Sequence, residues 1–212
     1  MSTIARIYTD QELLALRDRI HAMALDHGWW PDINEHGHCN FPPGLLEEKL
    51  VLVSTELSEA YEVYRDGIKL DAVWLSRGDA STPEDEHSPR PGEVPPGDRR
   101  LAKPEGFPVE LADAYIRILD LMGALRLTPQ PVVIALSGRE MTVGIGIFKF
   151  LRVIVDAGLI GAGSKELGTC LSQALAAIES FAHWFRINLK SAISQKMKYN
   201  ATRPFRHGGK KA

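Results

Sequence analysis

The feature that most constrains this chain is a pair of acidic doublets, each inside a long apolar segment. Glu56 and Glu59 form one doublet and Glu110 and Asp113 form the other, and in both the acids are three residues apart. Residues with this spacing share one face of an α-helix. A helix that is apolar around most of its circumference is usually buried. The two segments therefore predict two largely buried helices whose four carboxylates converge.

Converging buried carboxylates need a compensating cation. Burying an ionised carboxylate costs several kcal/mol, and neighbouring like charges raise each other's pKa values. Oxygen ligands with no nearby His or Cys favour Mg²⁺, with Mn²⁺ as a second option, over Zn²⁺, and Mg²⁺ sites commonly recruit substrate phosphates. The four acids therefore predict a Mg²⁺ site that binds a nucleotide. The alternative is ordinary solvated acids, or ion pairs with Lys49 or Arg117.

The rest of the chain predicts one all-α domain, residues 1–212. We expect a compact helical bundle of about five to six helices with a four-helix catalytic core, and we find no convincing strand alternation. Possible capping boxes at Thr9 with Glu12 and at Ser137 with Glu140 mark two helix starts. The expected helices run from Thr9 to Gly28 and over about 45–65, 108–126, 137–157, 164–184 and 189–199.

Two segments are expected to lie outside this bundle. Residues at about 71–102 contain a proline-rich, charged stretch with few large apolar groups, which predicts a mobile loop insertion, either a tolerated surface loop or a lid. Residues 196–212 contain six Lys and Arg side chains and no acid, so they should attract anions locally. The last part, at about 203–212, is expected to be a basic tail, disordered from Arg206 onward.

Composition excludes several classes of protein. A formal net charge of −2 gives no global reason to bind nucleic acid or an anionic membrane. The two cysteines, Cys39 and Cys170, are too few for a disulfide framework, and the N-terminus lacks a signal-peptide pattern. The longest apolar stretch, 141–155, is interrupted by Lys149 and Arg152. These observations predict a soluble cytoplasmic protein with neither nucleic acid nor membrane as a partner.

Other candidate groups have competing interpretations. A metal site at His36, His38 and Cys39 is disfavoured, because no second ligand pair follows at zinc-finger spacing. Trp29 and Trp30 could stack on a base, although packing in the core is the commoner role of such aromatics. Asp120, on roughly the face of Asp113, could approach the metal through water.

Three blocks of this sequence resemble the MazG-like family of all-α nucleoside triphosphate pyrophosphatases, which has dimeric dUTPase-like relatives. They are EKLVLVSTELSEAYEVYR at 48–65, KPEGFPVELADAYIRILDL at 103–121 and KMKYNATRPFRHGGKK at 196–211. The first two contain the family's Glu-x-x-Glu and Glu-x-x-Asp signatures, and the blocks occur in the family's order. The chain departs from the pattern in its connection from Glu59 to Glu110, which is usually much shorter in relatives.

The resemblance implies a hydrolase that cleaves an NTP or dNTP to the monophosphate and pyrophosphate, by attack of metal-activated water at the α-phosphorus. It implies that Glu56, Glu59, Glu110 and Asp113 are the metal-binding and catalytic residues, with either Glu56 or Glu59 as general base. It assigns Lys196 and Asn200 to phosphate or base contacts, and we add Arg203 and Lys103 to this nucleotide-binding set. A homodimer or homotetramer is expected. A non-catalytic nucleotide-binding regulatory module and a purely structural helical oligomer remain as alternatives.

Overall fold

The structure is a computed structural model that describes residues 6–30, 41–77, 102–132 and 141–206. It confirms a mostly helical, all-α fold. The described residues form six helices: α1 (Asp10–Asp26), α2 (Leu45–Arg65), α3 (Phe107–Ala124), α4 (Val143–Ile160), α5 (Glu166–Trp184) and α6 (Leu189–Asn200).

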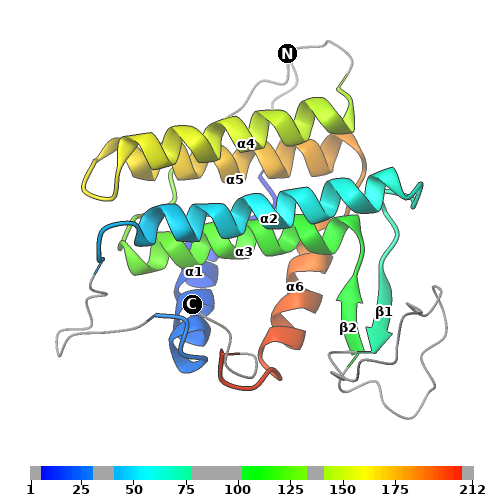
Figure 1. Ribbon diagram of the computed structural model, residues 1–212, viewed down its shortest axis with the longest axis horizontal. Coiled ribbons are helices and arrows are strands. Elements are labelled where there is room, and N and C mark those ends of the chain that lie inside the picture. Colours follow the sequence, from blue (N-terminus) through cyan, green and yellow to red (C-terminus); the bar gives the residue numbers. More distant parts are fainter. Residues whose placement is uncertain (1–5, 31–40, 78–101, 133–140, 207–212) are drawn as a thin grey trace.

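Helix α3 is the centre of the bundle. It runs antiparallel beside α2, the pair α4 and α5 covers one side of these two helices, and α1 and α6 extend from the other side (Figure 1). Because α3 contacts α1, α2, α5 and α6, most of its residues are buried. Any polar side chain on α3 therefore needs a specific partner or a ligand.

Several helix boundaries follow the local signals in the sequence. The Thr9 side chain accepts a hydrogen bond from the Glu12 backbone N–H, and the Glu12 side chain accepts one from the Thr9 N–H, so the predicted capping box at α1 is confirmed. Helix α2 has the predicted bounds. The helix that we expected to begin at Ser137 instead begins at Val143, after Thr142, whose hydroxyl accepts from the Ile145 N–H. Ser137 and Glu140 lie outside the described residues.

The prediction of a loop over about 71–102 is wrong at both ends of that range, where the structure has two short strands. Strands β1 (Trp74–Arg77) and β2 (Ala102–Glu105) pair antiparallel, with Trp74 opposite Glu105 and Arg77 opposite Ala102. Each strand is too short to show alternation, and β2 contains Pro104, which cannot donate a ladder hydrogen bond. No clear local signal in the sequence therefore predicts the pairing of β1 with β2. Residues 78–101, which include the proline-rich stretch of the expected loop, lie outside the described residues.

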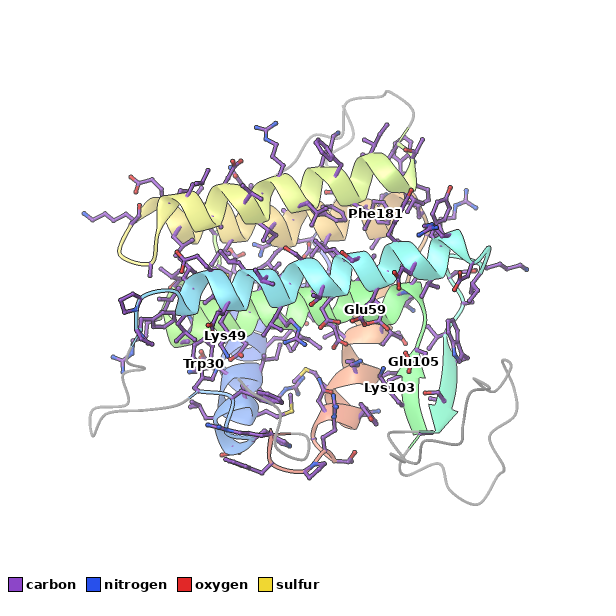
Figure 2. All side chains as sticks on the ribbon, viewed as in Figure 1. Trp30, Lys49, Glu59, Lys103, Glu105 and Phe181 are labelled. Atoms are coloured by element: carbon purple, nitrogen blue, oxygen red, sulfur yellow. The ribbon has the colours of Figure 1, made fainter. Side chains whose placement is uncertain are left out.

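An aromatic cluster connects the helices on the α4 and α5 side. The Phe181 ring stacks on Phe107, with ring centroids 5.8 Å apart, and meets Phe150 edge-on at 5.4 Å (Figure 2). Gly146 allows this approach, because a Cβ atom there would lie 2.3 Å from the Phe181 ring. The buried polar side chains gather instead on the opposite side of α3, where five of them line one pocket: Lys49, Glu56, Glu110, Asp113 and Lys196.

The outer face of α4 carries exposed apolar side chains. Ile145 and Phe148 are three residues apart, Val155 and Leu159 are four apart, and the exposed Arg152 lies between the two pairs in the sequence. Phe148 and Leu159 are 71% and 82% exposed. Within the described part of the chain, no helix combines the length and the apolar character needed to cross a membrane.

Candidate metal and nucleotide site

A cavity of about 440 Å³ lies beneath α2 and α3. Its walls come from α1, α2, α3, α6 and β2, which are far apart in the sequence. Figure 2 places Trp30 and Lys49 near the α1 end of this region and Lys103 and Glu105 near the strands. The cavity therefore has an aromatic end and a charged end.

Three of the four predicted acids meet at the charged end. Glu56 of α2 faces Glu110 and Asp113 of α3, all three side chains are buried, and one potential ligand atom from each lies within 4.8 Å of the others. Carboxylate oxygens this close can share one cation, and an all-oxygen donor set suits a hard divalent ion. The three residues could therefore hold a hard divalent cation.

Glu59 stands apart from this cluster. Its side chain is exposed, and it lines the same cavity without belonging to the group of three. Glu110 and Asp113 have the same three-residue spacing and both belong to the group, so helical spacing alone does not set Glu59 apart. Its exposure places Glu59 at the rim of the cavity. The structure thus brings together three of the four predicted metal ligands.

The electrostatics of the cluster favour added positive charge. Burial, together with the negative charge of Asp113, raises the pKa of Glu110 to about 8. Burial also raises the pKa of Asp113, an effect that Lys196 opposes. Both shifts arise because ionised carboxylates are crowded into a region of low solvent access, so a bound cation would stabilise their ionised forms.

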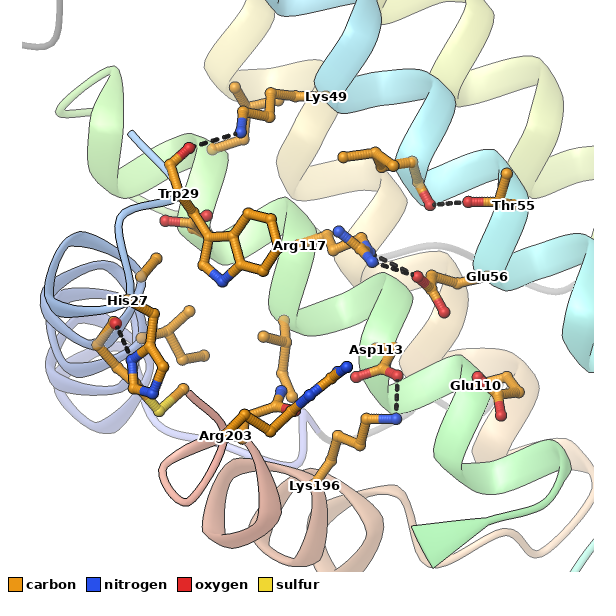
Figure 3. Close-up of a pocket in the computed structure, with 18 of the residues that line it drawn as sticks. His27, Trp29, Lys49, Thr55, Glu56, Glu110, Asp113, Arg117, Lys196 and Arg203 are labelled. Atoms are coloured by element: carbon orange, nitrogen blue, oxygen red, sulfur yellow. Dashed lines mark hydrogen bonds and ion pairs between the residues drawn. The ribbon is translucent and has the colours of Figure 1, made fainter. Parts of the chain in front are cut away.

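Two basic side chains already contact the acids. Nζ of Lys196, from α6, lies 2.5 Å from Asp113 Oδ2, and Nε and Nη2 of Arg117, from α3, each lie 2.6 Å from Glu56 Oε1 (Figure 3). Lys196 was predicted to contact nucleotide, and here it lies against a predicted metal ligand. The ion pair that the sequence offered between Arg117 and the acids is confirmed for Glu56. Arg117 lies four residues after Asp113, on the same helix face, and that spacing is the signal that could have placed it in the site.

The remaining predicted nucleotide contacts also line the cavity: Lys103, Asn200 and Arg203. Lys103 Nζ lies 2.9 Å from Glu105 Oε1, and burial, which alone would lower its pKa, is outweighed by nearby acids, so its pKa is raised. The side-chain oxygen of Asn200 is shielded from solvent and has no hydrogen-bond partner among the described residues. An unsatisfied buried acceptor is unfavourable, and a bound ligand would satisfy it.

The aromatic end is held by hydrogen bonds. The buried Trp30 indole N–H lies 2.8 and 3.0 Å from the two carboxylate oxygens of Asp120, which also pairs with His21. Lys49 lies over the Trp30 ring and donates to the Trp29 carbonyl oxygen. Trp30 is therefore a core residue. Asp120 holds it in place, lies outside the group of three acids and also lines the cavity. Trp29 is half-buried and lines the cavity.

The start of the basic tail is ordered against the end of α1. The Arg206 backbone N–H donates to the His27 carbonyl at 2.9 Å, and its Nε donates to the Gly28 carbonyl at 3.0 Å. The Phe205 ring covers Gly28 so closely that a Cβ atom there would lie 2.2 Å away. The expectation of disorder is thus wrong at Arg206, because long-range contacts hold it. Residues 207–212 and the disfavoured ligands His36, His38 and Cys39 lie outside the described residues.

A further buried carboxylate lies outside this cavity. Glu179 of α5 accepts a 2.6 Å hydrogen bond from the Tyr115 hydroxyl and a longer one, 3.3 Å, from the Ile7 backbone N–H. Burial raises its pKa, and the hydrogen bond from Tyr115 opposes that shift. These contacts give Glu179 a structural role, anchoring the N-terminal segment.

Comparison of the chain with protein-family models, with curated proteins and with solved structures found no match.

Proposed function

We propose that this chain is a Mg²⁺-dependent nucleoside triphosphate pyrophosphohydrolase, with Mn²⁺ as a possible substitute for Mg²⁺. The observation that carries the proposal is the group of three buried carboxylates with ligand atoms within 4.8 Å of one another. This group opens into a cavity that also presents basic side chains to a phosphate chain. The resemblance of the three sequence blocks to MazG-like pyrophosphatases supports the same activity.

The two ends of the cavity favour one orientation of the bound substrate. Its volume, about 440 Å³, falls within the usual range for small-molecule sites. The phosphates would lie at the end that holds the acids, Lys196 and Lys103, where a cation links carboxylates to phosphate oxygens. The base would lie toward Trp29, whose half-buried ring offers a stacking surface. Asn200 and Arg203 also line the cavity and would contact the nucleotide.

The proposed reaction is hydrolysis at the α-phosphorus. A bound divalent ion would supply a more acidic water and offset charge on the phosphates. Glu56, Glu110 and Asp113 would hold that ion. Of the two candidate bases, we assign proton removal from the attacking water to Glu59, because it lines the cavity, is exposed and lies outside the ligand group. A bond forms between water oxygen and the α-phosphorus, and the bond from that phosphorus to the α,β-bridging oxygen breaks. Pyrophosphate leaves with the bridging oxygen.

A non-catalytic nucleotide-binding regulatory module would have the same residues, so an experiment must separate the two. Purified full-length protein is incubated with a panel of ribo- and deoxyribonucleoside triphosphates and Mg²⁺, and the products are separated by chromatography. We expect equal amounts of monophosphate and pyrophosphate from at least one nucleotide, and no turnover with chelator. Nucleotide binding without products would favour the regulatory module, and diphosphate plus phosphate would contradict attack at the α-phosphorus.

We also propose a cytoplasmic homodimer or homotetramer. The exposed apolar side chains of α4 support assembly, because exposed apolar side chains gathered on one helix can be buried in an interface. The buried thiol of Cys170 is free, as expected in a reducing compartment.

A further inference from the structure

Arg117, whose side chain is partly exposed, forms an ion pair with Glu56, a predicted metal ligand. Two of its nitrogen atoms, Nε and Nη2, lie 2.6 Å from the same oxygen of Glu56. A guanidinium held by a carboxylate in this way is a charge-assisted contact and is stronger than a neutral hydrogen bond. The Glu56 carboxylate is thus neutralised by a side chain of the protein itself.

A metal ion and the Arg117 guanidinium would compete for Glu56. Both carry positive charge, and in a buried site two cations on one carboxylate repel strongly. Lys196, on α6, stands in a similar relation to Asp113, but its side chain is only 4% exposed. The Arg117 side chain is 40% exposed, so it can reorient into the cavity at a smaller cost.

We propose that Arg117 is an exchangeable counter-ion, which neutralises Glu56 while the site lacks a metal and moves to the substrate phosphates when a metal binds. This inference rests on the proposed function. The planar fork of a guanidinium matches phosphate oxygens in pairs, which an ammonium group does not. In Figure 3 the guanidinium lies between Glu56 and Trp29, hence between the acid cluster and the aromatic end of the cavity. A phosphate chain running between these two ends would pass within its reach.

The exchange predicts two effects of opposite sign for Arg117→Gln. Mn²⁺ binding to metal-free full-length protein, followed by electron paramagnetic resonance, should become roughly tenfold tighter, because a competing cation has been removed. Binding of inorganic pyrophosphate at saturating Mn²⁺, followed by calorimetry, should become roughly tenfold weaker, because a charged donor pair has been lost. Neither measurement depends on turnover.

Two further variants separate this role from simpler ones. Lys103→Gln also removes one positive charge from the cavity wall, but the ion pair of Lys103 is with Glu105, outside the acid cluster, so Mn²⁺ binding should tighten less than in Arg117→Gln. Arg117→Lys keeps the charge and loses the fork, so pyrophosphate binding should stay weak while Mn²⁺ binding remains close to wild type. Circular dichroism checks that each variant is folded.

The outcomes distinguish the two proposals. If wild-type protein does not bind Mn²⁺ at all, the proposed function fails. If wild type binds Mn²⁺ and pyrophosphate, but Arg117→Gln weakens both or changes neither, the exchange is overturned and Arg117 has only a structural role. Should Arg117→Gln not fold, Arg117→Lys decides the question, because unchanged pyrophosphate binding in that variant overturns the exchange as well.

Discussion

Nζ of Lys196 and Oδ2 of Asp113 are 2.5 Å apart, and both side chains are almost completely withdrawn from solvent. This ion pair connects α6 to α3, and both residues line the cavity. Two further carboxylates, those of Glu110 and Glu56, lie close to Asp113. Lys196 therefore compensates a cluster of acids and not Asp113 alone.

Lys196→Met should destabilise the metal-free protein strongly. The substitution leaves three crowded carboxylates with less compensating charge, and breaking a buried ion pair typically costs about 3–5 kcal/mol. Chemical denaturation without metal should show a loss of this size, and excess Mn²⁺ should restore much of it. Asp113→Asn should cost less, because the Asp113 charge raises the pKa of Glu110, so its removal favours an ionised Glu110 that keeps a negative charge near Lys196. Equal losses in the two variants would contradict this view of the cluster.

Glu56→Gln and Asp113→Asn should each lower pyrophosphate release by about two orders of magnitude or more, without unfolding the protein, because each variant loses a ligand for the cation. The release is measured with a coupled phosphate assay at saturating Mg²⁺. Glu62→Gln is the matched control, because Glu62 lies on the exposed side of α2 and does not line the cavity. Near-normal turnover in either ligand variant would count against the metal site.

Glu59→Gln should separate catalysis from metal binding. If Glu59 accepts the proton of the attacking water, kcat should fall by roughly 10²–10⁴-fold. The affinity for Mn²⁺ should change little in comparison with Glu56→Gln, because Glu59 lies outside the group of three ligands. A loss of Mn²⁺ affinity equal to that of Glu56→Gln would show instead that Glu59 binds the ion, as first expected from the sequence.

Glu110 should give the metal-free protein an unusual dependence on pH. Its pKa of about 8 in the folded protein lies above the ordinary value of 4.5, so the folded state binds this proton more tightly than the unfolded state. The resulting stabilisation is complete below about pH 4.5 and is lost as the pH rises through about 8, and it is worth on the order of 5 kcal/mol.

Thermal melts of metal-free wild type and Glu110→Gln between pH 5 and 9 measure this contribution. Wild type should lose stability relative to the variant as the pH rises, because glutamine carries no ionisable proton. Addition of Mn²⁺ should remove the loss in wild type, since a bound cation stabilises ionised Glu110. Parallel pH profiles for the two proteins would contradict the raised pKa.

Phe148→Asp should weaken self-association. A charge in the middle of the exposed apolar face of α4 would have to be desolvated in any interface formed there. Light scattering coupled to size-exclusion chromatography should show a smaller species than wild type. Val73→Ser, which alters an exposed apolar side chain outside α4, serves as the control. A wild-type monomer at micromolar concentration would exclude the proposed oligomer.

Local signals in the sequence predicted most of the helices and three of the acids that meet in the cavity, although α4 begins at Val143 and not at Ser137. The capping residues of α1 and the apolar run of α2 act within a few residues, so they can be found without a structure. The same holds for the acids at helical spacing, because a shared helix face depends only on local geometry. Three of those four acids do meet in the structure.

Other features depended on contacts between segments far apart in the chain. The β1 and β2 pair and the docking of Arg206 on His27 each join residues whose own neighbourhoods in the sequence give little sign of a partner. The exclusion of Glu59 from the ligand group was decided by how α2 is rotated against α3. Helical periodicity determines which side chains share a face, but only the packing of one helix on another decides which of them reach the same point in space.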